Sequence, residues 1–492
     1  MQYNNLIDGQ WVATQSGKTF QSVNPADPSD SLGEFPASGE ADVERAVQAA
    51  DRALPAWSRT PAPVRAEILF NIGQELKRRK QDLGRLMTRE MGKVLKEALG
   101  DTQEAIDMSI YLAGEGRRLL GHTTPSELPH KMNYAIRRPI GRLALITPWN
   151  FPLAIPAWKI MPTLVAGNTL VWKPSSDTPR MAYELSKICS EQGLPPGVFN
   201  LVFGSGSSVG VPLASHPKID MISFTGSAET GRAIYQMGAQ KLNKVHLELG
   251  GKNPIVVLED GDLELALEGI IWSAFGTTGQ RCTACSRLII EDGVYDQLLD
   301  KLAEATQKLR LGDGLQPETD VGPVVNRAAL EKIAHYVELG KQEGAKLLTG
   351  GEVASEGELA KGFFYRPTLF VEVKPEMTIW REEIFGPVLS IIKARDFDEA
   401  IRLANDTHYG LSSSIYTQDI NKAMRAVDRL EAGMTYINSG TIGAEVHLPF
   451  GGIKDTGNGG REAGIAAIDE YSEWKTIYID YSGKLQKAQG ID

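Results

Sequence analysis

The chain reads Thr169-Leu170-Val171-Trp172-Lys173-Pro174-Ser175-Ser176, a short apolar run of β-forming residues that ends in a polar turn. Similar runs occupy residues 143–146, 199–203 and 221–224, and each is followed by a turn and a stretch with helical periodicity. Strands that alternate with helices in this way are typical of βαβ units around a parallel sheet. The sequence therefore predicts an α/β fold for this block.

The segments on either side of the block are predicted to form further units. Before it, Val43, Val47 and Leu54 recur at helical spacing, so residues 1–120 are predicted to be largely helical. After it, residues 248–462 again alternate between strands and helices, which predicts a second α/β domain. Residues 131–138 and 474–481 are predicted to be strands without a nearby partner, and such edges are often covered by another subunit.

The composition is that of an ordinary globular protein. The chain has 492 residues, 42% hydrophobic and 23% charged, which indicates about two or three domains. A net charge of −10 argues against a nucleic-acid partner. The most apolar region contains Asn150, Lys159 and Asn168, which argues against a membrane span. The absence of a signal-peptide pattern, with only three cysteines, predicts a cytoplasmic address.

Two other segments carry residue types that suit thiol chemistry: Gly279-Gln280-Arg281-Cys282 and His246-Leu247-Glu248-Leu249-Gly250-Gly251-Lys252. The thiolate is the reactive form of cysteine, and a nearby carboxylate can deprotonate the thiol or a water molecule that attacks a thioester. Cys282 and Glu248 are therefore candidates for nucleophile and base. The alternative is a buried, inert cysteine, and Cys282 and Cys285 also have the spacing of a redox pair. No further ligand supports a metal site.

The ends of the predicted strands carry residues that suit a phosphate ligand. Thr225-Gly226-Ser227 follows one strand, and Ser227 is placed to cap a helix whose first amides suit a pyrophosphate. Open α/β sheets bind ligands at this edge, although Thr-Gly-Ser is also a common turn. The glycine-rich residues 204–210 have one residue too many for a dinucleotide fingerprint, and they are predicted to be a plain loop.

Together these motifs resemble the aldehyde dehydrogenase superfamily over nearly the whole chain. The matching residues are Pro148-Trp149-Asn150-Phe151-Pro152, Lys173-Pro174-Ser175, Phe224-Thr225-Gly226-Ser227 with Gly231, Leu247-Glu248-Leu249-Gly250-Gly251-Lys252, Gly279-Gln280-Arg281-Cys282, Glu383-Ile384-Phe385-Gly386-Pro387 and Pro449-Phe450-Gly451-Gly452. The resemblance implies an α/β, aldehyde dehydrogenase-like fold with three parts. These are a Rossmann-like cofactor-binding domain (1–121 and 140–247), an α/β catalytic domain (248–462) and small β oligomerisation strands (122–139 and 474–492) of a homodimer or homotetramer.

The resemblance also implies a mechanism. Cys282 would add to the aldehyde carbonyl, with Asn150 and the Cys282 backbone N–H as donors to the oxyanion. Hydride would pass to a nicotinamide, and Glu248 would activate the water that hydrolyses the thioester left on Cys282. The presence of Glu248 favours this hydrolysis over the acylating, coenzyme A-using branch.

The cofactor residues follow from the same resemblance. Glu383 would hold the nicotinamide ribose beside Phe385, Lys173 would reach the adenine ribose, and Ser227 would reach the pyrophosphate. The implied set also includes Trp149, Gly226, Gly231 and Leu249. Ser176 stands where NAD-preferring members often have a glutamate that repels a 2′-phosphate, so NADP, or dual use of NADP and NAD, is predicted. Alternatively, Ser176 is only a turn residue and NAD is preferred.

The substrate is expected to be an aldehyde with a carboxylate at its far end. Arg281, beside the nucleophile, could grip that carboxylate, or it could form a structural ion pair. Glu104 could bind an ammonium group, although a surface position is favoured. Other residues expected to line the pocket are Phe151, Ala154, Trp158 and Phe450. Arg281 and the Gly443-Ala444-Glu445 run favour α-ketoglutaric semialdehyde over α-aminoadipic, succinic and glutamic semialdehydes, and a broad-range enzyme is a further alternative.

Two other classes of protein are alternatives, a cysteine hydrolase and a non-catalytic nucleotide-binding relative. A cysteine hydrolase could pair Cys282 with His246, which strand alternation places on the same side as Glu248, but that interpretation leaves the cofactor motifs unexplained. A non-catalytic nucleotide-binding relative would be expected to have lost Cys282 or Asn150, and both are present.

Overall fold

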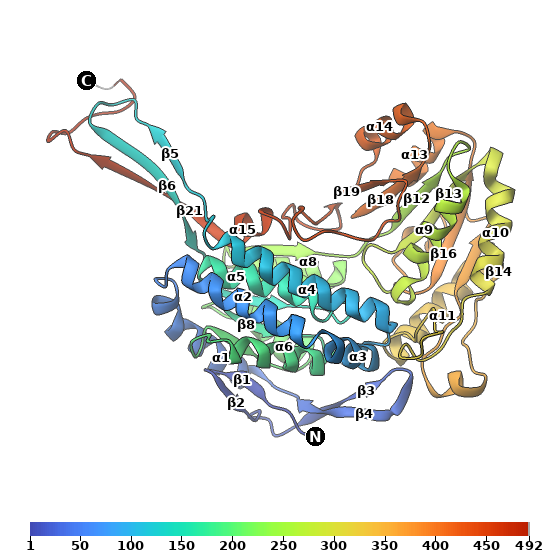
Figure 1. Cartoon of the computed structure of the whole chain (residues 1–492), viewed down its shortest axis with the longest axis horizontal. Helices are drawn as coiled ribbons and strands as arrows, with labels where there is room; N and C mark the ends of the chain where they lie inside the picture. Colours follow the sequence, from blue (N-terminus) through green and yellow to red (C-terminus); the bar gives the residue numbers. More distant parts are fainter. Residues whose placement is uncertain (491–492) are drawn as a thin grey trace.

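The computed structural model describes residues 1–490, in which two seven-stranded sheets form two lobes and a three-stranded sheet projects from them (Figure 1). The first sheet has the order β11-β10-β7-β8-β9-β1-β2. Its strands are β1 (Asn5–Ile7), β2 (Gln10–Val12), β7 (Arg142–Ile146), β8 (Thr169–Lys173), β9 (Phe199–Leu201), β10 (Met221–Thr225) and β11 (Lys244–Glu248). The strands β7 to β11 run parallel, which confirms the βαβ prediction.

Helices cover both faces of this sheet, because successive side chains of each strand point to opposite faces. In β8, Leu170 and Trp172 pack in one core and Val171 packs in the other. The helices of the first core are α2 (Ala62–Arg78), α3 (Lys80–Met91), α4 (Leu95–Glu115), α5 (Ala154–Ala166) and α6 (Pro179–Glu191). Those of the second are α1 (Glu40–Trp57), α7 (Val211–Ser215) and α8 (Ala228–Ala239).

The expectation of a largely helical N-terminal segment is wrong for its first 36 residues, which form two hairpins. The hairpins consist of β1 with β2, and of β3 (Thr19–Asn24) with β4 (Asp27–Pro36). The turn between β1 and β2 is Asp8-Gly9, and both residues have positive φ, 55° and 74°. This geometry is that of a two-residue hairpin turn, for which Asp-Gly is a favoured sequence.

The glycine-rich segment predicted to be a plain loop is instead a helical turn. Gly206–Gly210 forms one turn of π-helix that runs into α7. The Ser205 hydroxyl caps this turn by accepting a hydrogen bond from Ser208 N at 3.0 Å.

The second sheet has the order β14-β15-β16-β13-β12-β18-β19, and all its neighbours are parallel except β14 with β15. The strands are β12 (Asn253–Val257), β13 (Cys285–Glu291), β14 (Lys346–Thr349), β15 (Thr368–Val371), β16 (Val388–Ala394), β18 (Ser412–Tyr416) and β19 (Met434–Ile437). Its helices are α9 (Leu263–Phe275), α10 (Tyr295–Gln307), α11 (Arg327–Gln342), α12 (Thr378–Arg381), α13 (Phe397–Asn405) and α14 (Ile420–Arg429). This confirms the alternation predicted for the second block.

The two predicted strands that lacked partners pair with each other. The strand β21 (Ser472–Asp480) runs antiparallel to β6 (Lys131–Pro139) from Ser472 opposite Pro139 to Asp480 opposite Lys131, and β5 (His122–Pro125) lies on the other side of β6. Figure 1 shows these three strands as an arm that extends away from both lobes. The last two residues of the predicted segment 474–492 lie outside the described residues.

After β19 the chain returns to the first lobe and packs behind β11. Leu249 N donates to Thr456 O at 2.7 Å, and Leu247 N donates to Asn458 Oδ1 at 3.0 Å. This segment includes β20 (Ile453–Lys454), which pairs with β17 (Tyr409–Gly410), and α15 (Ala466–Glu470). Within residues 1–490, no helix combines the length and the apolar character needed to cross a bilayer.

Candidate active site

Cys282 lies in a tight connection between α9 and β13. The three residues Thr277, Thr278 and Gly279 have positive φ of 52°, 58° and 69°, an unusual conformation for the two threonines. Glu97 holds the turn by accepting a hydrogen bond from Thr277 N at 2.9 Å. A side chain at Gly279 would overlap the carbonyl of Gly386, so only glycine fits there. The connection therefore places the next residues, including Cys282, in a defined position.

Two cavities meet at Cys282. One has about 720 Å³ of free space and is lined by Glu104, Phe151, Ala154, Ile155, Trp158, Thr225, Glu248, Leu249, Arg281, Cys282, Thr283, Gly443, Ala444, Phe450 and Glu462. The other has about 660 Å³ and is lined by Pro148, Trp149, Asn150, Ile155, Thr225, Gly226, Ser227, Leu249, Gly250, Cys282, Lys332, Glu383 and Phe385. We call them the substrate-side and the cofactor-side cavity. The substrate-side cavity is lined by every residue expected to bind substrate. The cofactor-side cavity is lined by most of the residues expected to bind cofactor.

The surroundings of Cys282 favour the neutral thiol over the thiolate. Burial raises the pKa of Cys282 to about 12, and the carboxylates of Glu383 and Glu248 add to the effect because they repel a thiolate. Cys285 does not form a redox pair with it here, because all three cysteines are free and the two side chains pack in different cores. A thiol in these surroundings can act as a nucleophile only when a nearby base removes its proton.

Glu248 is the last residue of β11 and lines the substrate-side cavity with Cys282. Burial raises the pKa of Glu248 to about 8, and the nearby positive charge of His246 opposes the rise. Among residues 1–490, its Oε2 has no hydrogen-bond partner. A buried carboxyl group with a pKa near neutrality and a free oxygen can exchange a proton with a thiol or with water.

Asn150 is buried on the cofactor-side cavity, where its Nδ2 donates to Gln280 O at 3.1 Å. A side-chain amide has two N–H donors, so one N–H remains for a ligand oxygen. Asn150 and Cys282 therefore line one cavity, and the role of Asn150 as a donor to the oxyanion stays a prediction.

The cofactor-side cavity is lined by the N-terminus of a helix and by polar and aromatic side chains. Ser227 caps α8 by accepting a hydrogen bond from Thr230 N, which confirms the predicted cap, and Gly226 lies beside it on the cavity wall. Glu383 accepts a hydrogen bond from Gly251 N at 2.9 Å, and burial raises its pKa. Trp149 and Phe385 stand edge to face with ring centroids 5.5 Å apart.

Three residues of the implied cofactor set do not line this cavity. Lys173 is buried at the end of β8, and burial lowers its pKa to about 8. Ser176 donates to Gly204 O at 3.3 Å. Gly231 packs against Leu249, whose Cδ2 would lie 2.5 Å from an added Cβ, so its role in the structure is the close approach of α8 to the sheet.

Sequence reasoning missed several residues of both cavities. Pro148, Thr225 and Gly250 lie within the quoted motifs, which could have identified them. Lys332, whose Nζ donates to Glu383 O at 3.2 Å, carries no local signal because it comes from α11 of the second lobe.

Arg281 both forms a structural ion pair and lines the substrate-side cavity. Its Nη2 lies 3.1 Å from Glu97 Oε1, and its Nε donates to Thr277 Oγ1 at 2.9 Å, so a structural ion pair exists. It also lines the substrate-side cavity, and within the described residues its Nη1 has no hydrogen-bond partner. The guanidinium therefore keeps one donor edge for a ligand.

The favoured surface position for Glu104 is wrong, because its side chain lines the substrate-side cavity. Burial raises the pKa of Glu104 to about 8, with a contribution from the Asp101 carboxylate. At neutral pH this residue is largely a neutral acid, which suits it as a hydrogen-bond donor and makes it a poor partner for an ammonium group. Trp158 and Phe450, edge to face at 4.8 Å, form an apolar part of the wall.

Comparison with known proteins identifies the class. Residues 11–477 match the model of the Aldehyde dehydrogenase family, and the chain belongs to this family. It is 42% identical over 477 residues to α-ketoglutaric semialdehyde dehydrogenase of Bacillus subtilis (strain 168), covering 97% of this chain and 98% of that protein. It is 42% identical over 479 residues to 2,5-dioxopentanoate dehydrogenase of Saccharolobus solfataricus, covering 97% and 99%.

The solved structures agree with this assignment. The crystal structure of betaine aldehyde dehydrogenase from Staphylococcus aureus in complex with NAD+ superposes with a TM-score of 0.96 at 34% identity, covering 98% of this chain and 95% of that one. The protein is thus an oxidoreductase that oxidises an aldehyde with a nicotinamide cofactor. The cofactor-side cavity has groups that suit part of such a dinucleotide, because the capped N-terminus of α8 can receive a phosphate and the Glu383 carboxyl group can accept hydrogen bonds from hydroxyl groups.

Proposed function

We propose that the protein oxidises a carboxylated semialdehyde, first of all α-ketoglutaric semialdehyde, to the acid, with Cys282, Glu248 and Asn150 as its catalytic residues. The observation that carries the proposal is that Arg281 and Cys282 line one cavity. The names of the relatives given above support the choice of substrate. If the apolar residues of the wall decide specificity instead, the protein is a broad-range aldehyde dehydrogenase.

Catalysis begins when Glu248 takes the proton of the Cys282 thiol and the sulfur adds to the aldehyde carbon. The free N–H of Asn150 and the backbone N–H of Cys282 stabilise the oxyanion of this thiohemiacetal. A bound nicotinamide supplies the acceptor for the hydride that leaves the carbon, and a thioester remains on Cys282. Glu248 passes this first proton to solvent and then removes a proton from water as the water oxygen attacks the thioester. The carbon–sulfur bond breaks to release the acid, and the proton taken from water returns to the sulfur of Cys282.

Arg281 and Glu104 are suited to bind the far carboxylate of the substrate. The Nη1 edge of Arg281 can donate to a carboxylate oxygen without giving up the contact with Glu97. Neutral Glu104 can donate its O–H to the same group. Together they would make the substrate-side cavity selective for an anionic aldehyde.

The test of this proposal is Arg281→Gln. We expect kcat/KM for α-ketoglutaric semialdehyde to fall about 10- to 100-fold, because a hydrogen bond to a charged group is lost. For pentanal, which has no carboxylate, kcat/KM is expected to change less than threefold. Glu97→Gln is the matched control, because it removes the ion pair and keeps the guanidinium. Equal losses with both aldehydes, reproduced by Glu97→Gln, would assign Arg281 a structural role only.

We further propose that NADP is preferred, or that NADP and NAD are both used. The support is that Ser176 is small and neutral beside Lys173. Ser176→Glu is expected to lower kcat/KM for NADP about 30-fold, since a carboxylate beside a phosphate costs about 2 kcal/mol or more, and to leave NAD within threefold. Ser190→Glu, which adds the same charge in the last turn of α6, is the control. An NADP rate that Ser176→Glu leaves unchanged would contradict the role of Ser176.

Finally, we propose that the first and second sheets are the cores of the cofactor-binding and catalytic domains, and that the arm joins subunits into a homodimer or homotetramer. The arm exposes Trp474, Tyr478, Ile479 and Tyr481 along β21 and just beyond it. β21 is also an edge strand, so its outer hydrogen-bonding groups are open to another chain.

A further inference from the structure

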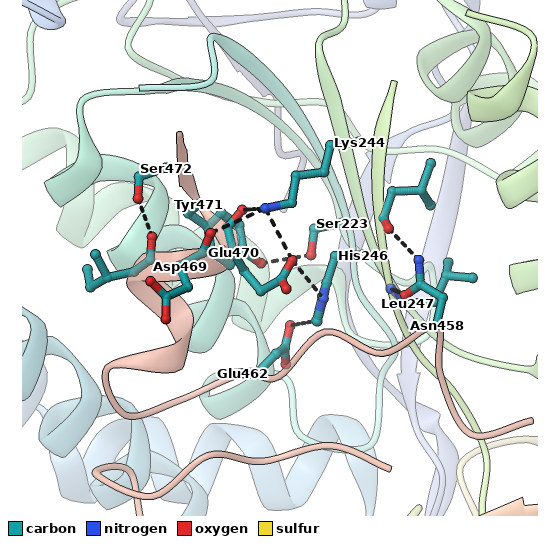
Figure 2. A network of polar contacts seen from close by, with 12 residues as sticks. Ser223, Lys244, His246, Leu247, Asn458, Glu462, Asp469, Glu470, Tyr471 and Ser472 are labelled. Carbon is teal, nitrogen blue, oxygen red and sulfur yellow. Dashed lines mark hydrogen bonds and ion pairs between the residues drawn. The ribbon is translucent and has the colours of Figure 1, made fainter. Parts of the chain in front are cut away.

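A cluster of buried charged groups lies directly behind the proposed general base. Figure 2 shows His246 on β11 between Glu462 and Glu470, with Lys244, Ser223 and Tyr471 close by. His246 and Glu248 lie two residues apart on the same face of β11, and neither the covalent chemistry nor cofactor binding accounts for His246.

The imidazole of His246 faces carboxylates on both of its nitrogens. Its side chain is 0% exposed, and Nε2 lies 3.6 Å from Glu248 Oε1 and 3.4 Å from Glu462 Oε1. On the opposite side, Nδ1 lies 3.5 Å from Glu470 Oε2. A neutral imidazole has one acceptor nitrogen, which here would face a carboxylate oxygen, so this geometry favours the imidazolium with two N–H donors. Although burial acts in the opposite direction, Glu462 and Glu470 raise the pKa of His246 to about 9.

The surrounding structure keeps the ring in this place. A side chain at Gly460 would overlap Nδ1 of His246 and would lie 2.9 Å from the Glu470 carboxyl carbon, so glycine leaves the space between them open. The Leu247 N–H, between the two residues, is held by Asn458 at 3.0 Å. The segment that returns from the second lobe therefore supplies the groups that fix His246 from behind.

Among the cations of the cluster, His246 acts most strongly on Glu248. Lys159 on α5 forms a buried ion pair with Glu462 and donates to Ser223 Oγ at 2.9 Å. Lys244 lies 3.5 Å from Glu470, and Tyr471 shares a hydrogen bond with Ser223. Lys159 and Arg461 contribute weaker positive fields at Glu248, and the Glu462 carboxylate opposes them.

We propose that His246 is a positioning residue for the general base, whose imidazolium, held by Glu470 and Glu462, favours the ionised form of the Glu248 carboxyl group while water attacks the thioester. This inference rests on the proposed role of Glu248. The proton taken from water goes to Glu248, and His246 keeps both of its protons. A neighbouring cation favours the ionised form of a buried acid, so the loss of His246 moves the ionisation of Glu248 to higher pH.

The experiment measures the rate of thioester hydrolysis after a burst of reduced cofactor, between pH 6 and 10, in the full-length enzyme. For His246→Gln we expect the rising limb of the profile to move up by about one pH unit. Hydrolysis then falls about tenfold at pH 7 and returns to the wild-type rate near pH 10. The amplitude of the burst is expected to change less than twofold, because Glu248 is the base of both steps and its ionisation slows them together. Glu470→Gln, at the more exposed side of the cluster, is expected to shift the limb in the same direction by a smaller amount. His216→Gln, which removes another histidine paired with a glutamate, Glu44, is the control.

The outcomes separate this inference from the proposal on which it rests. If the rising limb of the pH profile coincides with that of the wild type in both variants, the role of His246 is overturned. The same holds if Glu470→Gln lowers the rate of hydrolysis equally at every pH. If His246→Gln does not fold, Glu470→Gln alone decides by the same criterion. If Glu248→Gln hydrolyses the thioester at the wild-type rate, the proposed base itself is wrong, whatever His246 does.

Discussion

Cys282→Ala is expected to form no reduced cofactor with any aldehyde, with kcat lower by at least about 10⁴-fold. The reason is that the alanine methyl group cannot form the bond to the carbonyl carbon from which hydride leaves. Burial keeps the Cys282 thiol protonated in the resting state, so the variant loses little charge, and its fold and cofactor binding are expected to be retained. The measurement is the initial rate of NADPH and NADH formation, with cofactor binding followed by nicotinamide fluorescence.

Cys285→Ala is the matched control for this prediction. Cys285 is buried in β13 with its Sγ 3.5 Å from Arg287 O, and it does not line either cavity. Its loss removes a small buried side chain and is expected to cost about 1 kcal/mol of stability, while kcat changes less than threefold. Turnover by Cys282→Ala at more than a few per cent of wild type would contradict the covalent mechanism, and binding without turnover in the wild type would favour a non-catalytic relative.

Glu248→Gln is expected to stop the reaction at the thioester. Acylation and hydride transfer need Glu248 only to generate the thiolate, and a higher pH increases the small fraction of the thiol that ionises without it. Hydrolysis, in contrast, needs a base beside the attacking water. We expect about one equivalent of reduced cofactor per active site at pH 9, followed by turnover that is 10²- to 10⁴-fold slower than wild type. Intact-mass spectrometry of the quenched enzyme should then show the acyl group on Cys282.

Glu104→Gln serves as the control here, because Glu104 lines the same cavity and has a similarly raised pKa. It is expected to change KM for carboxylated aldehydes and to leave the rate of hydrolysis within threefold. Steady turnover by Glu248→Gln at the wild-type rate, with no acyl-enzyme, would show that another group activates the water.

The predictions from sequence succeeded where a local pattern decides the structure. The parallel strands β7 to β11 follow from alternating apolar runs and helices. The cap of α8 follows from Ser227, a favoured N-cap residue at the end of the turn after β10. The N-terminal hairpins lie outside the helical periodicity of residues 40–120, and Asp8-Gly9 is the local turn signal for the first of them.

The site was less accessible to sequence reasoning wherever it depends on distant segments. Helical spacing alone does not predict that Glu104 on α4 lines the same cavity as Gly443 and Ala444, which are distant in sequence. Strand alternation placed His246 beside Glu248, but the carboxylate of Glu470 reaches the ring only because the chain returns from the second lobe. Contacts of this kind follow from tertiary packing, which has no local signature.

The most direct test of the central claim is kcat/KM of the wild-type enzyme for α-ketoglutaric semialdehyde, succinic semialdehyde and pentanal, with NADP and with NAD. We expect α-ketoglutaric semialdehyde to exceed pentanal by about 10- to 100-fold, because only the carboxylated aldehyde can use Arg281. Equal or higher values for pentanal would contradict a carboxylated substrate and indicate a broad-range aldehyde dehydrogenase.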